Sequence, residues 1–111
     1  MINLKISPFL VGKEHAVKLE EFEPNGGYEL FLKDVCLYLG AIFVKWHQGI
    51  EIGVGEIIYK DYKMTVVWTD FPQYLSFDCE DQTMAQQLYK ELEDYFHLHE
   101  ERWASAWNLG Q

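Results

Sequence analysis

The amino-acid sequence predicts an α+β domain in which an antiparallel sheet of four or five strands carries two helices packed on one face. Two patterns lead to this fold class. In the middle of the chain, apolar and polar residues alternate with a period of two, which indicates strands with one face on a core. In the last quarter, apolar residues recur at helical spacing, which indicates a long amphipathic helix. The chain of 111 residues is long enough for one such core, and we expect a single domain over residues 1–111.

Three consecutive strands form the clearest part of the predicted sheet. Apolar and polar side chains alternate over residues 62–69 and again over residues 75–79. Residues 57–59 form a β-rich run before them, and residues 60–61 indicate a tight hairpin turn. Pro72 lacks a backbone donor and interrupts the ladder between the last two runs. The pattern predicts an antiparallel meander.

A single helix from about Asp81 to Trp107 is predicted at the end of the chain, and its two faces differ in chemistry. Asp81 is a favourable N-cap residue. At about 100° per residue, one face collects apolar and aromatic side chains: Ala85, Leu88, Tyr89, Leu92, Phe96, His99, Trp103 and Trp107. The opposite face carries acidic residues, with Leu98 among them. We expect the apolar stripe to pack on the sheet and the carboxylates to face water.

The first half of the chain is less regular. Residues 29–39 have a helical apolar stripe and an i,i+4 ion pair, and Gly40 follows them, so helix is the preferred assignment. Residues 28–33 also alternate in a way that a strand would explain, and residues 14–23 fit either a short helix or an edge strand. We further expect strands at 2–6 and 42–46 and a loop at 24–27.

The chain is strongly acidic, and the acidity is concentrated in its second half. The net charge is −9, and residues 56–111 alone contain eleven carboxylates against four basic side chains, which leaves −7 there. The eight lysines and Arg102 are scattered and form no basic patch, so we do not expect nucleic-acid binding. An acidic surface instead favours association with a basic partner.

Two features bear on the cellular compartment. The longest apolar run, residues 35–44, is far shorter than the ~20 residues that cross a membrane, so we expect no membrane span. The N-terminus lacks the basic-then-apolar pattern of a secretory signal, and Cys36 and Cys79 stand alone among apolar neighbours. We therefore expect a cytoplasmic protein with two free, structural cysteines.

The residue patterns disfavour catalysis and cofactor binding. The glycines at 49–55 precede a strand and lack a phosphate-binding lysine, so turn or bulge glycines are expected. His97 and His99 lie about 200° apart on a helix and cannot share a metal ion. The serines lack a nucleophile context, and the carboxylates at 78–81 fit helix capping better than acid–base catalysis. We expect no enzyme activity, no cofactor and no metal site.

The segment Ser76-Phe-Asp-Cys79 leads into a helix start of the form Met84-Ala-x-x-Leu88-x-x-x-Leu92. With the small size, the acidity and the aromatic-rich α+β character, this stretch resembles the small bacterial immunity proteins that neutralise toxins, including those of contact-dependent growth inhibition. The resemblance covers about residues 40–100. It implies a cytosolic, non-catalytic inhibitor that binds a cognate toxin, often a basic nuclease.

The predicted partner-binding residues lie on the acidic helix face and just before the helix: Glu91, Asp94, Leu98, Glu101, Asp78 and Glu80. An apolar residue ringed by charges has the composition of a small contact site for a basic partner, here the cognate toxin. Three alternatives stay open. They are a homo-oligomeric or adaptor domain with Trp103 and Trp107 as interface anchors, a phage-type mimic of nucleic acid, and an enzyme with buried carboxylates.

Overall fold

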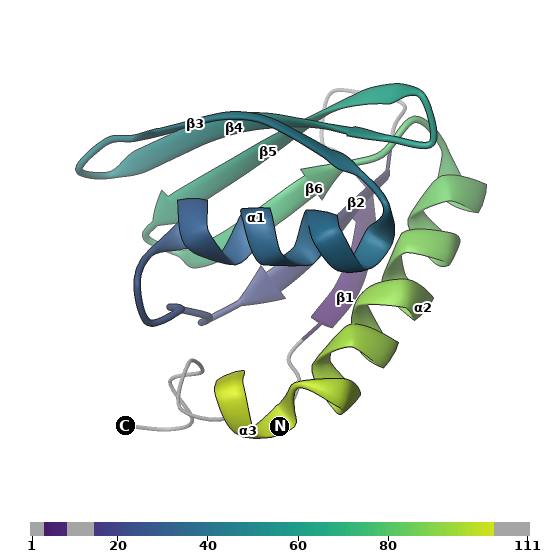
Figure 1. The fold of residues 1–111 in the computed structure, drawn as a ribbon. Coiled ribbons are helices and arrows are strands. Elements are labelled where there is room, and N and C mark those ends of the chain that lie inside the picture. The colour runs from purple at the N-terminus through teal and green to yellow at the C-terminus, as the bar shows by residue number, and fades with distance from the viewer. Residues whose placement is uncertain (1–3, 9–14, 104–111) are drawn as a thin grey trace.

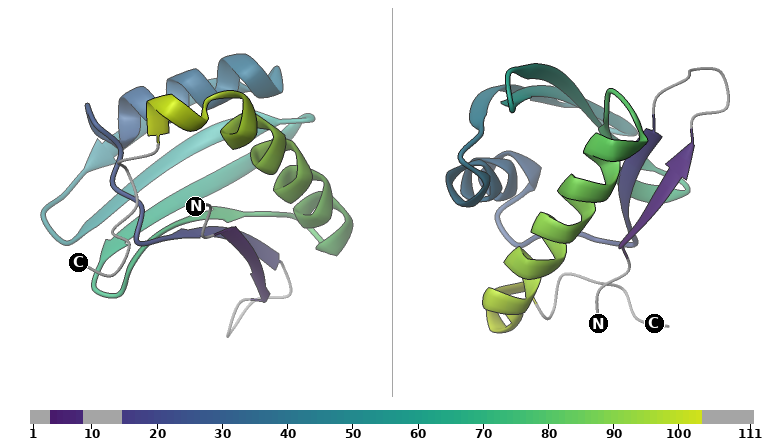
Figure 2. Two further views of the ribbon diagram at one scale, coloured as in Figure 1. Left: turned by 90° about the horizontal axis from the view of Figure 1, so that it is seen from below. Right: turned by 90° about the vertical axis from the view of Figure 1, so that its right-hand side faces the viewer.

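The computed structural model describes residues 4–8 and 15–103, which form a six-stranded antiparallel sheet with helices on one face (Figures 1 and 2). The elements in chain order are β1 (Leu4–Pro8), β2 (His15–Glu20), α1 (Tyr28–Leu39), β3 (Ile42–Gln48), β4 (Ile52–Tyr59), β5 (Tyr62–Asp70), β6 (Gln73–Asp78), α2 (Gln82–Leu98) and α3 (Glu100–Trp103). The predicted fold class is confirmed, although the sheet has six strands and a short third helix is present. None of the described helices is long and apolar enough to cross a membrane.

The sheet has the strand order β1-β2-β6-β5-β4-β3, and every neighbouring pair is antiparallel. β2 lies inside the sheet, because it pairs with β1 on one side and with β6 on the other. Both alternatives for residues 14–23, a short helix and an edge strand, are therefore wrong. Val17 and Leu19 are fully buried on the side that the helices cover. The long-range pairing with β6 is what makes this segment an inner strand.

β3 and β4 form a long hairpin around the glycine-rich segment. Gly49 lies in the turn, where its N–H donates to the carbonyl oxygen of Ile52 at 2.9 Å. Gly53 and Gly55 lie in β4 beneath the indole of Trp46, and a Cβ at either position would come within 2.6 Å of that ring. These glycines therefore serve a turn and a close side-chain approach, in agreement with the sequence interpretation.

A β-bulge interrupts β3 between Phe43 and Lys45. Val44 is the additional residue, and it lets Phe43 and Trp46 both pack on the helix-covered side while Val44 and Lys45 stay exposed. The expected strand at 42–46 is present within β3, but regular alternation would place Trp46 on the same face as Val44, and the bulge prevents this.

α1 confirms the helical assignment of its segment over the strand alternative. Phe31 and Val35 are fully buried against the sheet. The helix ends at Gly40, whose φ of 70° lies in the left-handed region that glycine adopts without steric cost. The expected i,i+4 ion pair is formed, with the Lys33 ammonium 3.1 Å from a Glu29 carboxylate oxygen.

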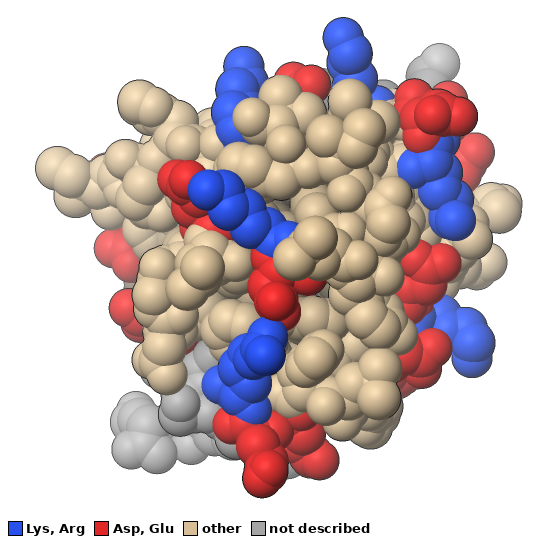
Figure 3. Space-filling model, viewed as in Figure 1, with Lys and Arg blue, Asp and Glu red and all other residues tan. Residues whose placement is uncertain are grey.

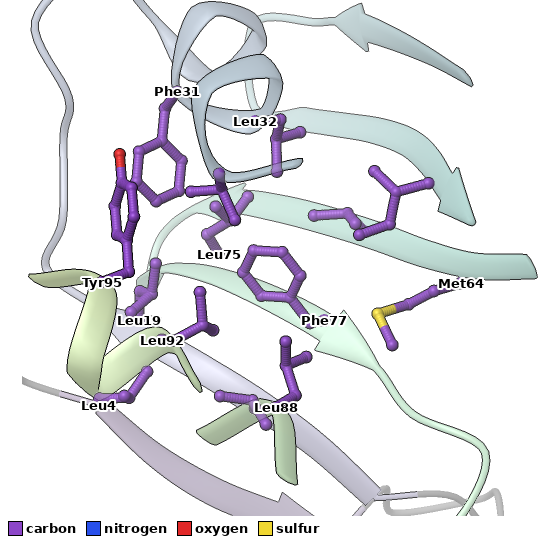
Figure 4. Packing of buried hydrophobic residues seen from close by; sticks show 14 of the residues in the cluster. Leu4, Leu19, Phe31, Leu32, Met64, Leu75, Phe77, Leu88, Leu92 and Tyr95 are labelled. Atoms are coloured by element: carbon purple, nitrogen blue, oxygen red, sulfur yellow. The ribbon is translucent and has the colours of Figure 1, made fainter. Parts of the chain in front are cut away.

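α2 begins where the sequence predicts, since Asp81 caps it by accepting the Met84 N–H at 2.8 Å. Figure 4 shows Leu88, Leu92 and Tyr95 of this helix in the core between helices and sheet. The buried side chains of α2 are Ala85, Leu88, Leu92, Tyr95 and Phe96. Tyr95 is missing from the expected stripe, although its i+7 spacing from Leu88 places it there. The predicted single helix to residue 107 is wrong, because α2 ends at Leu98 and α3 follows after a break.

Cys36 and Cys79 are buried and free, as expected. Burial raises the pKa of the Cys36 thiol to about 11 and that of the Cys79 thiol to about 12. Both side chains are therefore neutral thiols near pH 7, and they pack as small apolar groups in the core.

Substitutions on the two faces of α2 should differ sharply in their effect on stability. Leu88→Ala or Leu92→Ala should lower the free energy of unfolding by ~2–5 kcal/mol, because each removes fully buried volume and leaves a cavity. Asp94→Ala should change it by less than ~0.5 kcal/mol, because Asp94 is exposed. Urea unfolding followed by circular dichroism measures the three variants. Equal losses at all three positions would contradict this orientation of α2.

The thiols should be protected from alkylation in the folded protein. Because burial raises both thiol pKa values, native labelling of Cys36 and Cys79 should be slow at pH 8 and should accelerate at more alkaline pH. Unfolding in urea without reductant should then release two reactive thiols, counted by absorbance or by mass. A chain that shows no reactive thiol under those conditions would contain a disulfide.

Candidate functional site

The helical region at the C-terminal end changes direction at His99 (Figure 1). His99 has φ −117° and ψ 33°, outside helical geometry, yet its N–H donates to the Tyr95 carbonyl at 3.0 Å. Its own carbonyl accepts the Trp103 N–H at 3.2 Å. In an unbroken helix, Trp103 would lie about 10 Å beyond Phe96 along the axis. The break instead lets Trp103 fold back toward α1.

Trp103 is buried within its own chain, with only 4% of its surface exposed. Its ring centroid lies 5.2 Å from that of Phe31 and 6.1 Å from that of Phe22, and its Nε1 donates to the Tyr95 hydroxyl at 2.8 Å. Trp103 is therefore not free to anchor an interface with another chain, as the alternative of an oligomeric or adaptor domain requires, because its apolar surface already packs in the core. Trp107, the other expected anchor, lies outside the described residues.

Asp34 of α1 binds both segments on either side of the break. Its Oδ2 accepts the Tyr95 hydroxyl of α2 and the Arg102 Nη1 of α3, the latter at 2.8 Å. Burial and the hydrogen bond to Asp34 raise the pKa of the Tyr95 phenol, so the hydroxyl remains a donor at neutral pH. We call Asp34, Tyr95, Arg102 and Trp103 the latch, because together they hold α3 against α1 and α2.

The outer side of this region carries three of the predicted binding residues, Asp94, Leu98 and Glu101, which we call the α2–α3 surface. Leu98 is 69% exposed at the last position of α2, and both carboxylates are exposed beside it. Residues 97–102 line a shallow hollow of about 380 Å³ next to Leu98. Figure 3 shows carboxylates along the right-hand and lower edges of the molecule, where Figure 1 places α2 and α3.

Of the other three predicted binding residues, Glu91 lies one helical turn before Asp94 on α2, whereas Asp78 and Glu80 lie beyond the far end of that helix. Glu91 is half-buried and accepts the Tyr59 hydroxyl at 2.9 Å, so it joins α2 to β4. Asp78 is half-buried at the end of β6, where it accepts the Ser76 hydroxyl at 3.1 Å, and Glu80 is exposed just before α2. Because α2 has 17 residues, this end is separated from Leu98 by about 25 Å along the helix. The six predicted residues therefore do not form one site.

Sequence reasoning missed the residues that hold the α2–α3 surface in place. The i+7 spacing of Leu88 and Tyr95 was a signal for burial of that tyrosine, but Asp34 is separated from Tyr95 by 61 residues and no local pattern joins them. Among the described residues, no group of three or more His, Cys, Asp or Glu side chains is arranged to hold a metal ion. The α2–α3 surface offers the carboxylates of Asp94 and Glu101 as hydrogen-bond acceptors and the side chain of Leu98 as an apolar contact.

No known protein-family model, curated protein or solved structure matches the chain. A function for it therefore has to be inferred from the shape, the charge and the internal support of this surface. The contribution of the latch to the free energy of unfolding can be measured directly.

Removal of the Asp34 carboxylate should loosen the latch. Asp34→Ala should lower the free energy of unfolding by ~1–3 kcal/mol, because the buried Tyr95 hydroxyl and the Arg102 guanidinium both lose their acceptor. Glu29→Ala on the same helix is the matched control, since it breaks only the exposed pair with Lys33 and should cost less than ~0.5 kcal/mol. Urea unfolding measures both variants. Equal effects would show that Asp34 adds no more than a surface ion pair.

Proposed function

We propose that this chain is a non-catalytic, cytosolic immunity protein that neutralises a cognate basic toxin by binding it tightly through the α2–α3 surface. The single observation that carries this proposal is the exposure of Leu98 among carboxylates, on a segment held from behind by the latch. An exposed apolar side chain with a charged rim suits the centre of a protein interface. The negative rim suits a partner rich in lysine and arginine.

The latch supports the proposal because it orders the surface before a partner arrives. Trp103 and Arg102 fix α3 to the core and to α1, so Leu98 and Glu101 keep their relative positions in the free protein. Association loses less conformational entropy when the contacting groups are already ordered. An inhibitor of a toxic enzyme needs the tight binding that such ordering favours.

Charge supports the same kind of partner. The net charge of −9 attracts a cationic protein from a distance, and complementary fields raise association rates toward ~10⁸ M⁻¹s⁻¹ at low salt. Arg102 adjoins this surface, but its guanidinium is paired with Asp34 at 2.8 Å. Among the described residues, no salt bridge joins Asp94 or Glu101 to a basic side chain of this chain.

Each part of the surface has a definite role in this proposal. Asp94 and Glu101 accept hydrogen bonds from basic side chains of the toxin, and Leu98 packs in an apolar depression on it. Glu100 and Glu101 line the hollow of about 380 Å³ beside Leu98 together with Arg102, and these two glutamates are the acceptors for one arginine or lysine side chain of the toxin.

From this proposal we expect that a toxin domain is encoded beside the gene for this chain. The test is co-expression of the chain with the domain found there, with bacterial growth and binding of the purified pair as readouts. Asp94→Lys/Glu101→Lys reverses two exposed charges and should leave folding intact. It should abolish growth protection and slow association about tenfold, with a weaker dependence on salt. Glu91 is left unchanged, because its reversal would also remove the hydrogen bond from Tyr59.

The matched control, Glu21→Lys/Glu23→Lys, makes the same charge change at two exposed positions between β2 and α1, and it should retain growth protection. Leu98→Ala should mainly speed dissociation, because a central apolar contact acts on the lifetime of a complex. Stopped-flow mixing at low and high salt separates the two rate constants. If Asp94→Lys/Glu101→Lys protects growth and binds with unchanged rate constants, the α2–α3 surface is not the interface.

A further inference from the structure

The main concentration of exposed apolar side chains lies on the β3–β4 hairpin, far from the latch in the fold. Ten large apolar residues are exposed in the described part of the chain, and five of them lie on β3, on β4 or in the turn between them: Ile42, Val44, Ile50, Ile52 and Val54. α1 and α2 both lie on the other face of the sheet (Figure 2). We call the outward side of β3 and β4 the hairpin face.

The strand register gives the hairpin face a charged row between an apolar row and a row that pairs an imidazole with Val54. Lys45 pairs with Glu56 in the middle of the hairpin, and both side chains alternate with residues packed on the helix side. Ile42 pairs with Ile58 in the row on one side, and Val54 pairs with His47 in the row on the other side. No salt bridge joins Lys45 to Glu56 in the described residues, so both charges are available to another molecule.

We propose that the hairpin face binds a second copy of this chain in a symmetric dimer, with the two-fold axis parallel to the strands and between β3 and β4. Such an axis places β3 of one protomer over β4 of the other. Lys45 of each protomer then faces Glu56 of the other, and Ile42 faces Ile58. The two sheets pack face to face with nearly aligned strands, as in a β-sandwich.

Charge selects a second copy over other partners. The hairpin from residue 42 to 58 carries one lysine and two glutamates, whereas the whole chain has a net charge of −9. Two copies therefore repel each other less here than at the acidic surfaces. A basic protein is attracted to the α2–α3 surface instead. The Lys45–Glu56 row has one charge of each sign, and a copy turned by the two-fold axis presents the opposite order.

The edge strand of the sheet also favours the hairpin face as the site of dimer formation. β3 is the last strand of the sheet and has a strand partner only on its β4 side among the described residues. The bulge at Val44 and the charge of Lys45 make this edge a poor template for adding a further strand. Association through the outward face buries Val44 and pairs Lys45, whereas association through the edge leaves Ile52 and Val54 exposed.

The size of the face predicts a weak dimer. Five apolar side chains correspond to an interface at the low end of the known range, below ~1,200 Å² in total, so we expect a dissociation constant of roughly 10–100 μM. The dimer leaves the α2–α3 surface open, because that surface lies with the helices on the other side of the sheet (Figure 2). This inference goes beyond the proposed function and does not depend on it.

Sedimentation equilibrium of the full chain tests the dimer directly. The average mass should rise from 13.1 kDa toward twice that value as the concentration increases from about 1 to about 500 μM. Val54→Asp should hold the mass at that of the monomer. Leu37→Asp is the matched control, since Leu37 is 84% exposed on α1 and lies outside the hairpin face. It should dimerise like the unaltered chain.

A charge exchange tests the axis. Lys45→Glu and Glu56→Lys should each weaken self-association about tenfold, because like charges then face each other across the two-fold axis. An equimolar mixture of the two variants should associate at least as well as the unaltered chain, since a Glu-Glu row then faces a Lys-Lys row. A loss of stability within one protomer cannot explain recovery of association in the mixture. Each variant keeps two like charges at positions 45 and 56 of its own protomer, whether it is alone or mixed.

Circular dichroism checks that each variant is folded. If Val54→Asp does not fold, the charge exchange decides the matter by itself. A chain that stays monomeric at about 500 μM overturns the proposal. A mixture of Lys45→Glu and Glu56→Lys that associates no better than either variant alone also overturns it.

Discussion

The burial of Trp103 is the constraint on which the C-terminal part of the structure depends. Its ring packs edge-on against Phe31 of α1 and contacts Phe22 from the connection between β2 and α1. Phe31 in turn stacks on Phe96 of α2 at 5.9 Å, so one aromatic cluster joins both long helices to the chain that leaves β2. Aromatic side chains bury more area than any others, and four of them in mutual contact outweigh the preference of this segment to continue as a helix.

The break at His99 follows from that burial and creates the surface to which we assign binding. A continuous helix would carry Trp103 past the edge of the core, so α2 ends at Leu98 and α3 starts in a new direction. Leu98, which helical phase already turns away from the core, then lies at the corner, and the hollow lies beside it. Asp34 completes the arrangement, because its carboxylate accepts from both sides of the break.

The molecule has two surfaces of different character on opposite faces of its sheet. The α2–α3 surface is acidic and lies with the helices, whereas the hairpin face is apolar, with both charge signs in its middle row. The helix layer accounts for this separation. The helices pack on one face of the sheet and bury its side chains in the core. The other face carries no helix, so the outward side chains of β3 and β4 stay exposed there. A basic partner and a second copy would therefore not compete for the same residues.

Local patterns in the sequence determined much of the secondary structure. The two-residue period predicted β5 and β6, and Asp81 and Gly40 marked the start of α2 and the end of α1, because each of these signals acts within a few residues. Helical phase also placed Asp94, Leu98 and Glu101 away from the core.

Only the tertiary structure decided how distant segments meet. β2 is an inner strand because β6 pairs with it, and α3 turns back because Trp103 finds Phe31. The latch likewise depends on a contact between residues far apart in the chain, since Asp34 is separated from Tyr95 by 61 residues. A local period carries no information about such contacts, because their energy exists only after the core has formed.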